Sequence, residues 1–267
     1  MSSRLEDQAG VPLDRIVTYL DDILQTATTP DYPTALNGLQ LANRCVIRKV
    51  AAAVDFSTQT VRVAITEKAN LLIIHHGMFW AGLQPITGRG YSRLLELLGA
   101  DVAVYASHLP LDRHPQLGNN VLLAKTLGLE PSAEFARFKD IFIGVQGTAD
   151  IATQVLVDRA RAFSRANGGD TIATAGIDDS RRTRRWAVCT GAGASADTLA
   201  EAARGGVDTL IVGEGPHWTA VDAAERGLTI IYVGHYASET LGVYALADEV
   251  GRQFNVGCVK ISAPTGL

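Results

Sequence analysis

Seven histidine and acidic residues of this sequence have the types and spacing that metal chemistry needs. Two histidines are adjacent at the end of an apolar run, and two later histidines each precede an acid by four residues. Four of the six histidines in the chain belong to this set. Neutral imidazole and carboxylate are ligands for Zn, Fe, Mn, Co and Ni, so the set indicates a transition-metal site. Its members are His75, His76, His108, Asp112, Glu214, His235 and Glu239.

All of these residues come shortly after a predicted strand, which is where ligands bind in open parallel sheets. Neighbouring side chains on a strand point to opposite faces, so we expect the strand to end before His75 and His76 if the two share one site. Gly77 would permit the turn. Such a pair could face two ions, which a bridging carboxylate would hold roughly 3.5–4 Å apart. Asp112 and Glu239 are the best candidates for the bridge.

Each of these residues also has an ordinary structural interpretation. A single histidine after a strand is usually a hydrogen-bonded surface or core residue, and we interpret His114 and His217 in this way. Ser238 and Glu239 would also suit the start of a helix, where the dipole favours an acid. Asp112 would also suit a proline-flanked turn. The metal interpretation therefore depends on the clustering of the residues and not on any one of them.

Strands and helices alternate in the first half of the chain. The helix at 13–24 is predicted from apolar residues at helical spacing, and the strands from short apolar runs. The alternation favours an α/β fold with a mostly parallel sheet. The predicted helices are Leu13–Leu24, Thr58–Lys68, Tyr91–Leu98 and Asn119–Leu127, and the predicted strands are Val50–Val54, Leu71–Ile74 and Asp101–Ala106.

A second block begins near Glu134 and is less regular at first. Loops are expected at 167–169 and 177–185, the second of which contains the basic run 181–185. This run could hold phosphates or a partner, and a solvated loop before a strand is the simpler interpretation. The predicted strands are Ile141–Val145, Trp186–Thr190, Thr209–Val212, Thr229–Val233 and Val256–Ile261, and the predicted helices are Ile151–Ala166, Ser195–Arg204, His217–Arg226 and Glu239–Phe254.

The two blocks resemble each other in sequence. The segment 50–77 and the segment 186–215 both run strand, helix, strand and end in polar residues with glycine. The strand that follows each segment leads to a histidine with an acid four residues later. This correspondence indicates an internal duplication. The alternative is that any two βαβ units share such a pattern.

Composition excludes several classes of protein. An apolar fraction of 47% and a charged fraction of 19% over 267 residues predict a globular chain with a sizeable core. A net charge of −4 gives no reason to expect nucleic acid as a partner. The apolar runs are too short to span a membrane, and the polar N-terminal stretch is not a secretory signal. The three cysteines are scattered, so we expect reduced thiols and a cytoplasmic location.

Four motifs, in this order, resemble the Nif-three-like proteins, which are also known as GTP cyclohydrolase 1 type 2 homologues. They are NGLQ at 37–40, LLIIHHGMFW at 71–80, SHLPLDRHPQLGNNVLLAKTLGL at 107–129 and VGHYASETLGVYALADEV at 233–250. The family often has an aromatic residue and an acid just before its Asn-x-Gly-Leu stretch, whereas this chain reads YPTALNGLQ. This difference from the family pattern affects the substrate contacts expected from that loop. It does not affect the expected metal ligands.

The resemblance implies two related α/β domains with mostly parallel sheets, the second inserted in the first. The first, metal-binding domain would comprise 1–130 and 231–267, and the inserted domain 131–230. The resemblance also implies a ring-shaped homohexamer and a centre of two divalent transition-metal ions. The ligands carried over are His75, His76, Asp112, His235 and Glu239, whereas His108 and Glu214 would lie behind the ligands or near substrate.

Two functions from different classes fit these features. A two-metal site suits a hydrolase that cleaves a C–N bond, a phosphoester or an amide, with a small molecule such as a nucleotide as substrate. The chain has no P-loop and no GxGxxG to support nucleotide binding, and no catalytic residue is assigned. The alternative is a metal-binding adaptor or regulatory protein without turnover. Nucleophilic catalysis by Cys189 or Ser195 is not favoured, since neither has a base at a recognised spacing.

Overall fold

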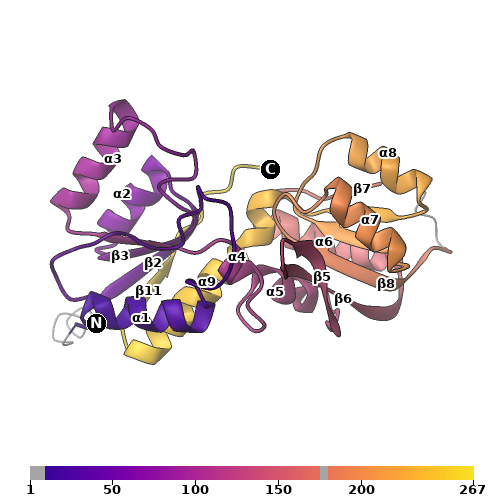
Figure 1. The fold of residues 1–267 in the computed structure, drawn as a ribbon, viewed down its shortest axis with the longest axis horizontal. Coiled ribbons are helices and arrows are strands. Elements are labelled where there is room, and N and C mark those ends of the chain that lie inside the picture. The colour runs from indigo at the N-terminus through magenta and orange to yellow at the C-terminus, as the bar shows by residue number, and fades with distance from the viewer. Residues whose placement is uncertain (1–9, 175–179) are drawn as a thin grey trace. The chain divides into compact units, whose positions relative to one another are not determined.

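The protein has two compact units. A computed structural model describes residues 10–174 and 180–267 (Figure 1). The first unit comprises the chain up to Leu111 together with Val243–Ala263, and the second comprises Asp112–Gly242 with Pro264–Leu267. The expected division differs from this one in its boundaries, because residues 112–130 and 231–242 fall in the second unit. Their apolar side chains, among them Leu123 and Ala237, are part of a core cluster of that unit.

The first unit contains a five-stranded sheet in the order β1-β4-β3-β2-β11. Its strand pairs are parallel, except that β1 runs antiparallel to β4. Every residue of β3 is buried, which explains why its sequence is a continuous apolar run that does not alternate. The strands are β1 (Gly38–Leu41), β2 (Lys49–Asp55), β3 (Leu71–His76), β4 (Ala103–Ala106) and β11 (Gly257–Lys260).

Helices cover this sheet with apolar faces. In α1 (Leu13–Leu24) the buried residues Ile16, Leu20 and Leu24 recur every four positions, as expected for one face of a helix. Helices α2 (Thr58–Thr66) and α3 (Gly88–Gly99) contribute Val61, Ala64 and Leu97 to the core cluster that includes β3 and β4. The carboxyl end of β3 thereby lies on a rigid, packed support.

The second unit contains a six-stranded sheet in the order β5-β6-β8-β9-β10-β7. Strands β8, β9 and β10 are parallel, whereas the other pairings are antiparallel. The α/β class is therefore confirmed, and this second sheet is mixed where a mostly parallel one was expected. The strands are β5 (Ala133–Phe138), β6 (Ile141–Ala152), β7 (Ile172–Ala173), β8 (Arg182–Cys189), β9 (Thr209–Val212) and β10 (Thr229–Tyr232).

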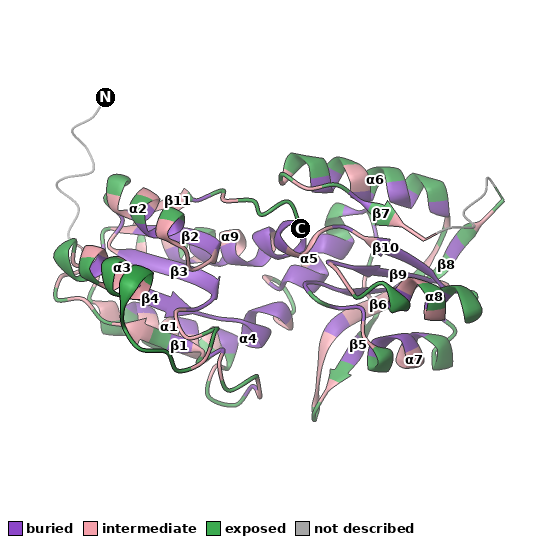
Figure 2. Ribbon diagram, turned by 90° about the horizontal axis from the view of Figure 1, so that it is seen from above, coloured by how far each residue is buried: buried purple, intermediate pink, exposed green. Residues whose placement is uncertain are grey.

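Both faces of the second sheet are covered by helices. Alternate residues of the central strands point to opposite sides, so Trp186 and Val188 join one core cluster and Ala187 and Cys189 the other. Figure 2 shows α6 on one side of this sheet and α7 with α8 on the other. The helices not yet named are α4 (Leu109–Asp112), α5 (Asn119–Thr126), α6 (Thr153–Ala166), α7 (Ala196–Arg204), α8 (Trp218–Glu225) and α9 (His235–Phe254).

Among the described residues, no helix is long and apolar enough to cross a membrane.

The two blocks of similar sequence have matching structures. Each provides three neighbouring parallel strands connected by two helices, β2-α2-β3-α3-β4 and β8-α7-β9-α8-β10. The first helix of each block begins with the same reciprocal cap, Ser57 with Thr60 in α2 and Ser195 with Thr198 in α7. An antiparallel edge strand adjoins the third strand of each block, β1 in one and β7 in the other. This shared cap and edge strand support the duplication hypothesis.

Candidate metal centre

Strand β3 carries both adjacent histidines into the interior of the first unit. His75 is 1% exposed and His76 is 8% exposed. His75 Nδ1 donates to the carbonyl oxygen of Ser107 at 2.8 Å, and His76 Nδ1 donates to Oδ1 of Asp55 at 2.8 Å. The two rings are 4.9 Å apart between centroids. Two residues adjacent on a strand therefore belong to one site.

The expected strand end before His75 is wrong. Strand β3 continues through His76, which pairs with Asp55 of β2. Gly77 does not have a positive φ, so it supplies no special turn. A Cβ on Gly77 would instead lie 2.3 Å from Nε2 of Gln40. Glycine is needed here because the Gln40 side chain crosses close to the backbone and accepts the Met78 N–H at 2.7 Å.

His108 follows β4 and is held by a buried acid. Its Nδ1 donates to Oδ1 of Asp31 at 2.9 Å, and its backbone N–H donates to Oδ1 of Asn37 at 2.7 Å. The Asp31 side chain is 6% exposed. Burial raises the pKa of Asp31, but hydrogen bonds and charge from His108 together with the Asn37 amide outweigh it, so the pKa lies below its ordinary value. The carboxylate therefore stays ionised and fixes the ring of His108.

The three histidines of the first unit form one group that could hold a metal ion. One ring nitrogen from each of His75, His76 and His108 lies within 4.8 Å of the others. Ring centroids of His75 and His108 are 5.0 Å apart, and those of His76 and His108 are 5.7 Å apart. The structure thus brings His108 into the same cluster as the adjacent pair.

In the second unit, His235 and Glu239 lie one turn apart on α9. The helix begins at His235, four residues before the predicted start, so the two side chains share a face. His235 Nε2 lies 3.2 Å from Oε2 of Glu239, which is 2% exposed. On its other side, His235 Nδ1 donates to Oε1 of Glu214 at 2.8 Å. Glu214 lies in the loop between β9 and α8.

The two acids create a strongly cation-binding environment around His235. Burial lowers the pKa of His235, whereas hydrogen bonds and charges of Glu239 and Glu214 raise it, and the net result is a pKa of about 9. A positive charge is therefore favoured between these carboxylates, and a metal ion would supply it in place of the proton.

Asp112, in the second unit, is buried and held by two consecutive asparagines. It is 7% exposed, and its Oδ1 accepts a hydrogen bond from Asn119 Nδ2 at 2.8 Å. Asn119 in turn accepts the Gly242 N–H at 2.7 Å. Asn120 donates to the backbone carbonyl of Asp112 at 3.2 Å. The carboxylate is thus a buried, oriented acid and not a surface turn residue.

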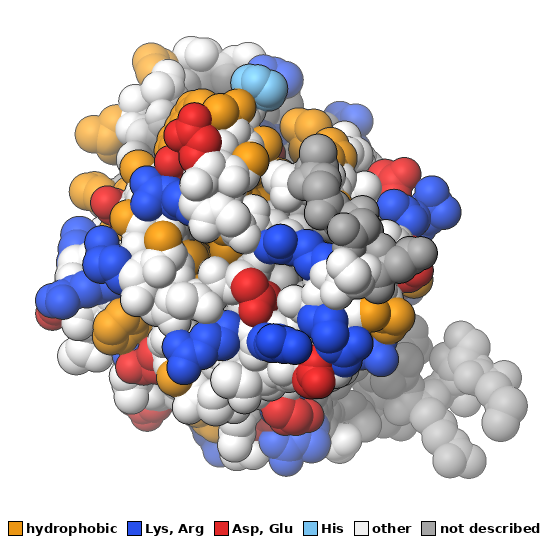
Figure 3. Space-filling view, turned by 90° about the vertical axis from the view of Figure 1, so that its right-hand side faces the viewer, with side chains coloured by type: hydrophobic (Ala, Val, Ile, Leu, Met, Phe, Trp, Pro, Cys, Tyr) orange, Lys and Arg blue, Asp and Glu red, His pale blue; other side chains and the backbone are white. Residues whose placement is uncertain are grey.

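The remaining polar residues of the sequence analysis have structural contacts. His114 Nδ1 accepts the backbone N–H of Leu117 at 2.9 Å, which closes a local turn. The predicted loop at 177–185 is wrong from Arg182 onward, since β8 begins there; residues 177–179 lie outside the described residues. Arg182 pairs with Asp150, and Arg185 donates to the carbonyl of Gly205 at 2.7 Å. Figure 3 shows basic and acidic side chains intermixed on this end of the second unit, so the run forms no uniform basic patch.

Sequence reasoning missed the residues that orient the histidines. Asp31 lies 77 residues from His108 along the chain, and Asp55 lies 21 residues from His76. No spacing rule connects residues so far apart. For Asp31, the signal that could have found it is the motif NGLQ, because its Asn37 binds both Asp31 and His108.

The chemistry of the donor set fits a metal site. In four histidines, His75, His76, His108 and His235, the Nδ1 atom donates to an oxygen at 2.8–2.9 Å. Three of the four acceptors are carboxylates, the partners that metal-ligating histidines commonly have. The proton on Nδ1 fixes the tautomer of each ring and leaves Nε2 as the nitrogen available to a metal ion. The fold and the site define a two-sheet α/β protein with histidine and carboxylate groups that could bind metal.

Comparison with known proteins identifies the family. A sequence profile of Duf34/NIF3 (NGG1p interacting factor 3) matches residues 11–265, and the chain belongs to this family. The GTP cyclohydrolase 1 type 2 homolog of Deinococcus radiodurans is 38% identical over 256 residues, which cover 95% of this chain and 94% of that protein.

Solved structures of similar proteins agree with the fold. Protein ybgI, of unknown function, has a TM-score of 0.85 and 31% identity, covering 95% of this chain and 99% of that one. TTHA1606 from Thermus thermophilus has a TM-score of 0.82 and 34% identity, with the same shares covered. The resemblance stated from the four motifs is confirmed.

Proposed function

We propose that the protein binds two divalent transition-metal ions through His75, His76, Asp112, His235 and Glu239. The observation that carries this proposal is that the three proposed histidine ligands all donate to oxygen through Nδ1. His108 and Glu214 remain outside the ligand set, Glu214 as the residue that orients His235 and His108 as a buried neighbour of the adjacent pair.

The proposed activity is metal-dependent hydrolysis. Two such ions, when bound, lower the pKa of a water molecule and stabilise negative charge on oxygen. The chain's own contribution is orientation and exclusion of water: Asp55 and Glu214 hold histidine rings, and Asn119 holds the Asp112 carboxylate. Imidazole and carboxylate ligands suit Zn, Fe, Mn, Co or Ni. The name of the relatives favours a nucleotide, with a C–N bond or a phosphoester as the bond cleaved.

Turnover by metal-loaded protein tests this proposal. Wild type and Asp112→Ala are reconstituted with each metal, and GTP and other nucleotides are followed by chromatography. We expect product only from the wild type, while circular dichroism shows both proteins folded. An equal amount of product from the Asp112→Ala variant would rule out the hydrolase proposal.

A second proposal, a metal-binding adaptor without turnover, is favoured by one surface. Three apolar side chains of α3 recur at helical spacing and are exposed by 55%, 56% and 52%: Tyr91, Leu95 and Leu98. In the loop before α3, Leu83 and Ile86 are exposed as well. Exposed apolar groups of this kind mark interaction surfaces. An adaptor would keep its binding partner after the metal ligands are substituted, whereas the hydrolase would lose its activity.

We also propose that the protein forms a homohexamer and acts in the cytoplasm. The exposed apolar face of α3, Tyr91–Leu95–Leu98, is the surface that self-association would cover. The three free cysteines are consistent with a reducing compartment. The mass of the purified protein in solution tests the first statement, and fractionation of the source cells tests the second.

A further inference from the structure

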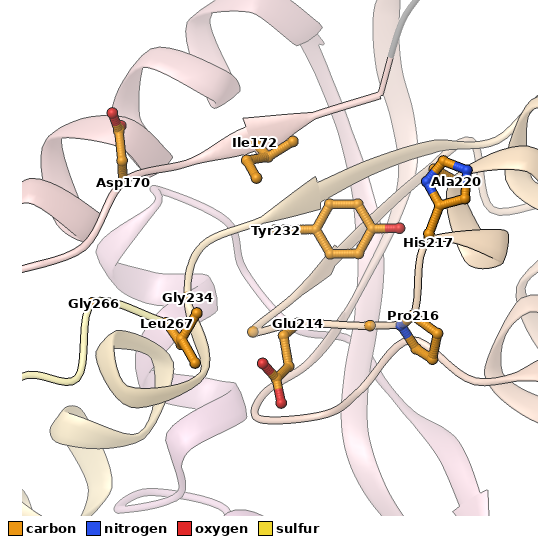
Figure 4. Close-up of a pocket in the computed structure, with 12 residues that line it drawn as sticks. Asp170, Ile172, Glu214, Pro216, His217, Ala220, Tyr232, Gly234, Gly266 and Leu267 are labelled. Carbon is orange, nitrogen blue, oxygen red and sulfur yellow. The ribbon is translucent and has the colours of Figure 1, made fainter.

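The second unit contains a pocket whose lining shares one residue, Glu214, with the proposed function. It has a volume of about 310 Å³, which is at the small end of the usual range for ligand sites. It lies at the carboxyl ends of β9 and β10, where α/β sheets commonly bind ligands. Figure 4 shows Tyr232 among Ile172, Pro216 and Glu214.

One wall of the pocket is aromatic and apolar. Tyr232 of β10 pairs directly with Ile172 of β7, and Ile172 is 70% exposed. The Thr219 hydroxyl donates to the carbonyl of Pro216 at 2.6 Å, so the Tyr232 hydroxyl must be the donor in its 2.7 Å bond to Thr219. The polar end of Tyr232 is therefore already engaged. Its ring is the part that faces a ligand.

The polar wall of the pocket accepts hydrogen bonds and carries negative charge. Oε1 of Glu214 accepts the Nδ1–H of His235, and the Glu214 side chain is 45% exposed. Among the described residues, no hydrogen bond to the second oxygen, Oε2, is formed. Asp170 also lines the pocket, and the residues that line it include no lysine or arginine. The pocket therefore favours neutral or cationic groups with N–H donors and disfavours phosphate.

We propose that this pocket binds the planar, nitrogen-containing ring of the substrate, such as a nucleobase. The ring packs on Tyr232 and Ile172, and an N–H of the ring donates to Glu214. This inference rests on the proposed function, because Glu214 also orients the proposed metal ligand His235 and so connects ring binding to the metal centre. It makes Tyr232 and Glu214 the residues that determine specificity.

Equilibrium dialysis of nucleosides against the metal-free, full-length protein tests the pocket by itself. The probes are guanosine, adenosine and cytidine, each of which carries an N–H donor on its base. We expect at least one to bind with millimolar affinity or tighter, and GTP to bind no more tightly than guanosine. Tyr232→Ala and Glu214→Gln should each weaken binding about tenfold or more, since ring contact or a charged hydrogen bond is lost.

Two matched variants control for folding and charge. Tyr232→Phe keeps the ring and should retain binding, and Glu225→Gln removes an exposed acid of the nearby helix α8 and should have no effect. No binding by any nucleoside, or full binding by Tyr232→Ala, overturns the inference. Metal content of the same preparations separates the two proposals. Metal uptake without nucleoside binding rejects the pocket alone, and nucleoside binding without metal uptake rejects the metal centre alone.

Discussion

At the scale of single residues, the histidines depend on the acids behind them. His76 donates through Nδ1 to Asp55, and this bond leaves Nε2 as the nitrogen that would bind a metal ion. An asparagine at position 55 can present its amide nitrogen to the ring, which removes the preference for one tautomer. In the proposed metal centre, these acids would contribute to metal affinity together with the ligands.

We predict that Asp55→Asn lowers metal affinity by about 10–100-fold, as substitutions behind metal ligands typically do. Metal affinity is measured by competition with a chromophoric chelator. The control is Asp14→Asn, which changes an exposed acid at the start of α1 and should leave affinity unchanged. An Asp55→Asn variant with wild-type affinity would show that the hydrogen bond to His76 has no role in metal binding.

The surroundings of Cys189 disfavour a reactive thiolate. The thiol is 3% exposed in the core beside β9, and burial together with the nearby acids Asp112, Glu201 and Glu239 raises its pKa to about 12. We predict that iodoacetamide at pH 8 leaves Cys189 unmodified in the folded protein and alkylates it after unfolding. Peptide mass spectrometry reads out the modification. Rapid alkylation of native Cys189 would reopen the nucleophilic mechanism that the sequence disfavours.

At the scale of elements, strand β1, which contains Gln40, braces the end of β3. Gln40 donates to the carbonyls of Ala35 and Leu36 and accepts from Met78, so its amide is fixed over Gly77. This close approach connects the NGLQ motif to the HHG motif. A side chain at position 77 cannot be added without displacing the amide.

We predict that Gly77→Ala destabilises the protein by about 0.5–1.5 kcal/mol, the usual contribution of one hydrogen bond, because it displaces the Gln40 acceptor of the part-buried Met78 N–H. Urea unfolding gives the free energy of unfolding for the variant and for Gln40→Ala. Because both changes break the same contact, the double variant should be less destabilised than the sum of the two. Strict additivity would show that Gly77 and Gln40 act independently.

The elements also show what the sequence could predict. Helix α1 and strand β9 match their predicted bounds, because clear apolar periodicity or a bounded apolar run marks each of them. The hairpin of β5 and β6 was missed in part because its turn uses Lys139 with φ 53°, a position where glycine or asparagine would have been a signal. The start of α9 was missed because His235 resembles a loop residue after a strand. Strand β7 has only two residues and lies at the edge of its sheet, so no pattern could reveal it.

For the candidate site, the sequence predicted which residues could bind a metal ion but not most of the acids that orient them. Residue types and their positions after predicted strands indicated the seven histidine and acidic residues as candidates for a metal site. The acids that orient the rings, Asp31, Asp55 and Glu214, come from other strands and loops. Only Glu214 was singled out, because it follows a strand in the repeat. Long-range pairing of this kind depends on tertiary structure, which periodicity does not encode.

At the scale of the whole molecule, the exposed face of α3 is the surface that the proposed self-association would cover. We predict that Leu95→Glu together with Leu98→Glu reduces the solution mass from that of the assembly to that of a single chain, since charges would be buried in the contact. Light scattering after size-exclusion chromatography measures the mass. The matched control, Val155→Glu, changes an exposed apolar residue of α6 and should leave the mass unchanged.

The proposal that most needs a direct test is the binding of two divalent transition-metal ions by the five proposed ligands. Elemental mass spectrometry of the wild type, His76→Ala and Glu239→Ala, each reconstituted with Zn, Mn, Fe or Co, measures this binding, because each variant removes one proposed ligand. We predict about two ions per chain in the wild type and a loss in both variants while circular dichroism stays native. A wild type that takes up no metal, or a variant in either unit that keeps the full metal content, would contradict the account.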